Sequence, residues 1–150
     1  MKPANIQPVS GSSIRPRLIV GMAALAALQL FHLLDVLRYD DAASFPGVLV
    51  DRQAIIGMGL TVVAFLLLVR RHPAARLVTI MAAAVVAVGF VIHHGIPAQI
   101  DGVTNPYWTA ADGNRADWIR WTTVLVIIAV GGIMGMTAWR ASPDVFGDRS

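Results

Sequence analysis

The sequence predicts an all-α integral membrane protein in which a single domain, residues 1–150, forms a bundle of four transmembrane helices. Hydrophobic residues make up 56% of the 150-residue chain, and its mean hydropathy is +0.64. Only 14% of the residues are charged, whereas a soluble domain carries about 25%. The apolar residues also gather into four long runs. So few charges cannot coat a water-facing surface, but they can mark the ends of helices that cross a bilayer.

The first two apolar runs predict helices over about residues 17–38 and 47–70. Crossing the hydrocarbon core takes roughly 20 residues, and the first run has this length between Arg17 and Arg38. It exceeds the apolar part of a cleaved signal peptide and contains polar residues, so we expect an uncleaved helix. The uncharged core of the second run is shorter, but it extends back toward Pro46, which suits the first turn of a helix.

The last two apolar runs predict helices over about residues 76–95 and 118–140. The third run is short as a strictly uncharged stretch, and we extend it to Gly95, which a proline follows two residues later. In the fourth run, Trp121 and Trp139 lie about 27 Å apart at about 1.5 Å of rise per residue. This spacing is typical of two aromatic anchors at opposite membrane interfaces.

Basic residues predict how the helices are oriented. Three lie before the first run and three more between residues 70 and 76, whereas the loops over 38–52 and 95–117 are balanced or acidic. By the positive-inside rule, both termini and the middle loop are therefore cytoplasmic. The basic excess at that membrane face accounts for the pI of about 10.2, so the expected partner is the lipid bilayer and not nucleic acid. The Arg-rich, Glu-free composition favours the plasma membrane of a GC-rich bacterium.

Composition excludes several kinds of site. The chain has no cysteine, which removes disulfides, thiolate nucleophiles and cysteine-ligated zinc or iron–sulfur centres. All nine acidic residues are Asp, which removes Glu-x-x-His di-iron bundles and the H-E-x-x-H protease helix. A P-loop, a dinucleotide fingerprint and a nucleophile elbow are also missing. The sequence therefore leaves enzymatic activity undecided.

A layer of polar residues near the outer face is the main candidate site. We counted the depth of each residue along its helix from the cytoplasmic end, at about 1.5 Å per residue. Three of the four histidines then lie at the same depth. These are His32 in the first helix and His93 and His94 in the third. Asp35 follows His32 by three residues, so the two share one broad helix face. Ionisable residues inside a membrane are costly, which makes them functional-site candidates.

The first interpretation of this layer is a bound cofactor. His32, Asp35 and one of His93 or His94 supply imidazole and carboxylate ligands that suit zinc, copper or non-haem iron. Only one of the two adjacent histidines is expected to share a given site, because neighbouring residues point about 100° apart around a helix. Haem b is the alternative cofactor, with His32 and His93 as its axial ligands.

The second interpretation needs no cofactor. Arg52 and Arg120 lie at a similar height on the second and fourth helices, so Asp35 can pair with either of them in a salt-bridge network or a gate. His32 and Asp35 can also form a titrating pair that handles protons or ions. Two functions follow. The protein is either a binding or accessory subunit whose layer holds a metal ion or haem, or an oligomeric transporter, channel or scaffold subunit.

The glycines, the outer loop and the termini give weaker signals. Gly131 and Gly135 have the small-xxx-small spacing of packed transmembrane helices, used either within the chain or in a homo-oligomer or larger membrane complex. In the outer loop over 95–117, Tyr107 and Trp108 either cover the polar layer as a lid or lie in the aromatic belt. The first fourteen and the last eight residues are polar, with Gly, Ser and Pro, so we expect no packed structure there.

Overall fold

The computed structural model describes residues 14–39, 52–95 and 118–146 of the chain. Within these ranges the structure is all helical and contains no strand. Four α-helices are followed by a short 3₁₀ helix: α1 (Ile14–Tyr39), α3 (Arg52–Val69), α4 (Ala75–Gly95), α5 (Trp118–Arg140) and η2 (Pro143–Phe146). The predicted all-α class is thereby confirmed for the described residues, and the bounds of α4 and α5 agree with the prediction to within one residue.

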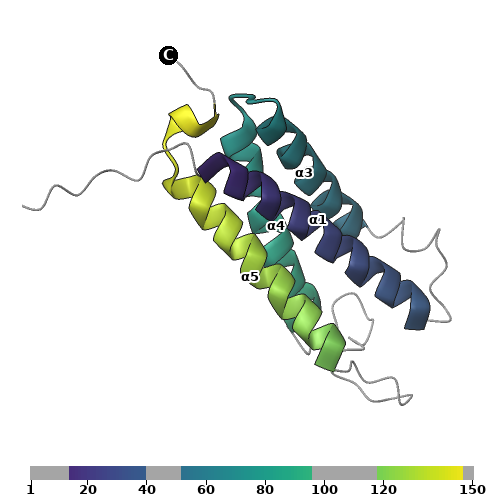
Figure 1. Ribbon diagram of the computed structural model, residues 1–150. Helices are drawn as coiled ribbons and strands as arrows, with labels where there is room; N and C mark the ends of the chain where they lie inside the picture. The colour runs from purple at the N-terminus through teal and green to yellow at the C-terminus, as the bar shows by residue number, and fades with distance from the viewer. Residues whose placement is uncertain (1–13, 40–51, 96–117, 147–150) are drawn as a thin grey trace, which may run out of the picture.

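The four helices lie side by side as an antiparallel bundle (Figure 1). α1 packs against α3 and α5, and α4 packs against the same two helices. Each helix therefore runs opposite to both of its neighbours, which is the up-down-up-down arrangement of many helix bundles. We call the end where α1 and α4 begin the basic end, after Arg15, Arg76 and Arg140. The end where α1 and α4 finish is the histidine end, after His32 and His94.

Three of the helices are long and apolar enough to cross a membrane: Ile14–Asp35, Ala75–Gly95 and Trp118–Arg140. The apolar stretch of α3, Ile55–Val69, is shorter, and the predicted start of this helix near residue 47 lies outside the described residues. Large apolar side chains also cover the outer faces, since Val20, Leu77 and Leu125 are all at least 60% exposed. Helices that are apolar outside as well as inside are typical of a bundle whose solvent is lipid.

The inward-facing residues recur at alternating spacings of four and three. On α1 they are Leu18, Met22, Leu25, Gln29 and His32. On α3 they are Gly57, Thr61, Ala64 and Leu68. A seven-residue repeat of this kind keeps one face of a helix against its neighbours along the whole bundle. Polar residues therefore occupy positions toward the histidine end that apolar residues hold elsewhere in the core.

Small residues bring α4 and α5 close together. A Cβ atom added to Gly135 would lie 3.1 Å from the Cβ of Ala83, and one added to Gly131 would lie 3.3 Å from the carbonyl oxygen of Ala83 and 3.4 Å from the Cβ of Ala87. The small-xxx-small pairs of the two helices therefore pack on each other within one chain. A homo-oligomer stays a prediction, but these two glycines already serve an intramolecular contact.

Arginines join the helices at the basic end. Arg15, the second residue of α1, donates hydrogen bonds from Nε and Nη2 to the carbonyl oxygens of Leu68 and Val69 at 2.9–3.0 Å. Arg76, the second residue of α4, donates to the last carbonyl oxygens of α5 at 2.8 and 3.3 Å. The last carbonyls of a helix lack intrahelical partners, so each arginine completes the end of a neighbouring helix. α1 begins at Ile14, before the predicted boundary at residue 17, and so includes Arg15.

The expectation of no packed structure in the last eight residues is wrong for η2. This short helix contacts α1 and α4, and Phe146 is only 1% exposed. Val145 and Ala141 are buried beside it in the same apolar cluster as Leu18. The two apolar residues of η2 thus fold back over the core at the basic end, despite the polar residues around them in the sequence.

Candidate functional site

The polar layer at the histidine end begins with a buried hydrogen-bond chain. Gln29 is 6% exposed and donates from Nε2 to the hydroxyl of Thr61 at 3.0 Å. Thr61 in turn donates to the carbonyl oxygen of Gly57 at 2.8 Å. A Cβ added at Gly57 would lie 3.4 Å from Oε1 of Gln29, which is an ordinary van der Waals contact. This hydrogen-bond chain was not predicted from the sequence. Its signal is that Gln29 lies three residues before His32 on the same helix face, and a buried amide needs a polar partner.

A pair of buried histidines forms the centre of the layer. The rings of His32 and His94 have centres 5.0 Å apart and meet edge to face, with an angle of 76° between their planes. Phe90 contacts both rings, at 5.1 and 5.3 Å between centres. Both histidines are less than 10% exposed. His93 is exposed, although its ring contacts that of His94.

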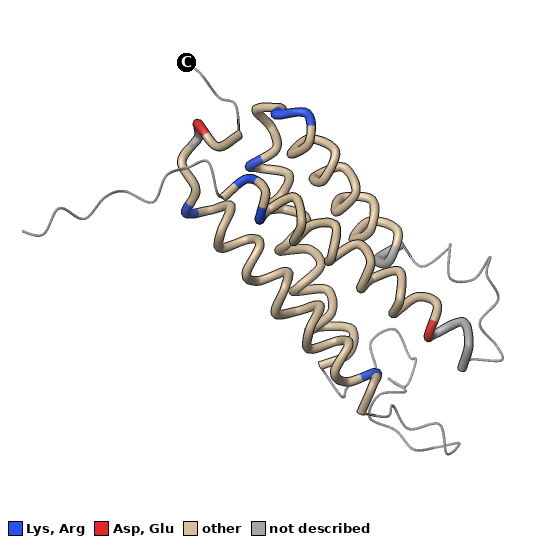
Figure 2. Tube along the Cα trace, viewed as in Figure 1, with Lys and Arg blue, Asp and Glu red and all other residues tan. Residues whose placement is uncertain are grey.

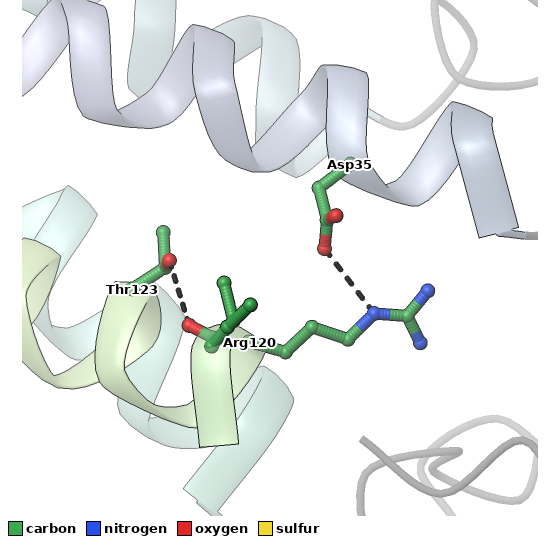
Figure 3. A network of polar contacts seen from close by, with 4 residues as sticks. Asp35, Arg120 and Thr123 are labelled. Atoms are coloured by element: carbon green, nitrogen blue, oxygen red, sulfur yellow. Dashed lines mark hydrogen bonds and ion pairs between the residues drawn. The ribbon is translucent and has the colours of Figure 1, made fainter. Parts of the chain in front are cut away.

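An ion pair lies at the end of the layer and joins the first helix to the last. Nε of Arg120 lies 3.2 Å from Oδ2 of Asp35, and each side chain is 15% exposed (Figure 3). Arg120 lies in the first turn of α5, where the hydroxyl of Thr123 donates to the carbonyl oxygen of Ile119 at 2.8 Å. Of the two predicted partners of Asp35, Arg120 is therefore the one seen. The side chain of Arg52, the first residue of α3, lies outside the described part of the chain.

The structure does not bring the predicted metal ligands together as one group. These ligands were His32, Asp35, His93 and His94. Among the described residues, no three His or Asp side chains come together in a way that could hold a metal ion. The physical reason is that Asp35 pairs with Arg120 on α5, whereas His32 packs against α4. The structure does bring two members of the set, His32 and His94, into contact.

Haem b does not fit between His32 and His94 as these two rings are packed. Metal–nitrogen bonds of about 2 Å, plus about 1.1 Å from each nitrogen to its ring centre, place two axial imidazoles about 6 Å apart on opposite sides of the porphyrin. The rings of His32 and His94 are closer, at 5.0 Å, and touch each other directly. The pair named for haem was His32 with His93, but the buried neighbour of His32 is His94.

The remaining site predictions fall outside the described residues. The proposed lid residues Tyr107 and Trp108 belong to residues 96–117, as does most of the outer loop. The structure adds a further participant that was not predicted from the sequence, Phe90. It lies four residues before His94 on α4, and this spacing on one helix face could have marked it as a neighbour of the histidine.

Protein-family models, curated proteins and solved structures were all compared with the chain, and none of them matches it. The function therefore has to be inferred from the residues of the polar layer and the shape of the bundle.

Proposed function

We propose that the chain is an accessory or scaffold subunit of the bacterial plasma membrane, with the polar layer as a structural network that holds its helices together. The observation that carries this proposal is the ion pair between Asp35 and Arg120. It joins α1 to α5, the two helices that close the bundle. The hydrogen bond between Gln29 and Thr61 joins α1 to α3 in the same way.

The cost of charge in a membrane supports a structural role for this pair. A charged side chain at the centre of a membrane helix costs about 2.5–3.5 kcal/mol on insertion scales, and less near the interface. A partner of opposite charge at 3.2 Å offsets this cost once the helices have packed. The pair therefore favours the folded bundle over separately inserted helices.

A second candidate function keeps the histidine pair as part of a metal site. Two imidazoles bound to one ion at about 2 Å, with about 105–110° between the bonds, have ring centres about 5 Å apart. The separation of 5.0 Å between His32 and His94 agrees with this bent arrangement. Water or further side chains would complete the coordination of zinc or copper.

Metal analysis separates the two candidates. The full chain, purified in mild detergent, is examined for bound metal by mass spectrometry and for haem by its visible spectrum. A structural network predicts no stoichiometric metal and no Soret band, because its polar groups serve as partners for one another. His32→Ala and His94→Ala are compared with His93→Ala, which removes an exposed histidine of the same layer.

Stoichiometric metal would contradict the structural proposal. If that metal is lost in His32→Ala and His94→Ala but retained in His93→Ala, the second candidate replaces the first. A Soret band that disappears in His32→Ala would instead establish haem binding.

A further inference from the structure

An apolar groove lies on the outer surface between α4 and α5, in the half of the bundle nearer the basic end. It is open rather than enclosed, and its volume is about 410 Å³. Alanines of α4 and glycines of α5 line it together with Met136 and Trp139, and none of its lining residues is charged. A groove of this composition suits a flexible hydrocarbon chain.

Basic side chains surround the interfacial end of the groove. Arg140 directly follows the groove residue Trp139 and is exposed. The guanidinium of Arg76 is held beside the same helix end, because its Nε and Nη2 donate to the carbonyl oxygens of Ala138 and Trp139. The described basic residues at this end of the bundle are all arginines (blue in Figure 2), and Asp144 of η2 is the one acidic residue among the described residues there.

The length of the groove also agrees with a lipid tail. From Gly131 to Trp139, α5 advances about 12 Å at about 1.5 Å per residue. This length runs from the interface into the hydrocarbon core of one leaflet, which is about 15 Å deep. Trp139 is 66% exposed at the interfacial end, where the indole ring of a tryptophan is favoured.

We propose that this groove binds an acyl chain of an anionic phospholipid, whose phosphate lies beside Arg76 and Arg140. Basic pockets between transmembrane helices are known to attract anionic headgroups, and the apolar groove below them takes the tail. The proposal goes beyond the structural role of the polar layer, which lies at the opposite end of the bundle, so either can fail without the other.

Native mass spectrometry of the full chain in detergent tests this binding. Phosphatidylglycerol and phosphatidylcholine with identical tails are added at equal concentration. We expect the chain to retain phosphatidylglycerol preferentially, by about fivefold or more, because one favourable interfacial charge contributes about this factor.

Two variants with matched controls locate the lipid. Gly132→Leu fills the groove, since a Cβ at Gly132 meets nothing within 4 Å, and it should abolish retention of both lipids. Gly59→Leu is its control, because Gly59 is equally open but lies on α3. Arg140→Gln should remove most of the preference for phosphatidylglycerol, whereas Arg17→Gln, an exposed arginine of α1, should preserve it.

Three results would overturn the proposal. The first is equal retention of the two lipids by the unaltered chain. The second is unchanged lipid retention in Gly132→Leu. The third is a dimer that Gly132→Leu dissociates while Gly59→Leu does not, because a second copy of the chain would then occupy the groove.

Discussion

At the scale of single residues, a glycine sets how closely α4 and α5 can pack. Gly135 of α5 faces Ala83 of α4 so closely that an added Cβ would lie only 3.1 Å from the Cβ of Ala83. Both atoms are fixed to helix backbones, so neither can rotate away. The helices would have to move apart, and the dispersion contacts along their interface would weaken.

This contact predicts that the same substitution, Gly→Ala, changes the stability differently at two positions. Gly→Ala inside a helix gains up to about 1 kcal/mol from helix propensity alone. We expect Gly59→Ala, at a position with nothing within 4 Å, to show this gain. Gly135→Ala has the same gain but also crowds its neighbour, which costs about 1–3 kcal/mol. The free energy of unfolding in mixed micelles measures both variants, and equal stability of the two would refute the close contact.

At the scale of helices, arginines both complete helix ends and predict orientation. Arg15 and Arg76 occupy the second positions of α1 and α4 and bond to the last carbonyls of α3 and α5. The same residues, with those near the turn between α3 and α4, make one end of the bundle basic (Figure 2). The positive-inside rule assigns that end to the cytoplasm, which we propose as the orientation in the membrane.

Single cysteines test this orientation, because the natural chain contains none. Ser142→Cys places an exposed thiol at the basic end, and Trp118→Cys replaces a residue that is 76% exposed at the histidine end. In intact cells, a maleimide that cannot cross membranes should label Trp118→Cys. It should label Ser142→Cys only after the cells are permeabilised. Labelling of Ser142→Cys in intact cells would reverse the proposed orientation.

The helices could be predicted from the sequence because lipid imposes their length and composition. The run after Arg76 had to be apolar for about 20 residues, and α4 ends at Gly95 as expected. The fold of η2 could not be predicted this way, because the burial of Phe146 depends on a gap at the end of the assembled bundle.

The depth of the site residues along their helices could be predicted from the sequence. The rotation of each helix about its own axis, which decides where a side chain points, could not. Counting residues placed His32 and both histidines of α4 at one depth, and the ring contacts of His94 with His32 and His93 agree with that depth. The choice of His94 over His93 depends on how α4 is rotated against α1, and a difference of about 100° between neighbours decides it. The choice of Arg120 as the observed partner of Asp35 likewise depends on which helix lies beside α1 at that point.

At the scale of the whole molecule, contacts at opposite ends hold the bundle closed. At the basic end, the arginines join α1 to α3 and α4 to α5, and η2 covers the core. At the histidine end, the pair of Asp35 with Arg120 joins the first helix to the last. A bundle closed in this way presents apolar outer faces to its surroundings, which is compatible with a membrane protein.

A double-mutant cycle on Asp35 and Arg120 tests this account most directly. Asp35→Asn, Arg120→Gln and the double variant are compared with the natural chain by their free energy of unfolding in mixed micelles. If the pair holds the bundle together, each single substitution destabilises it. The double variant should then lose less than the sum of the two by about 1 kcal/mol or more, as contacting residues in a polar network do. Additive losses, within about 0.5 kcal/mol, would show that the pair does not hold the helices together.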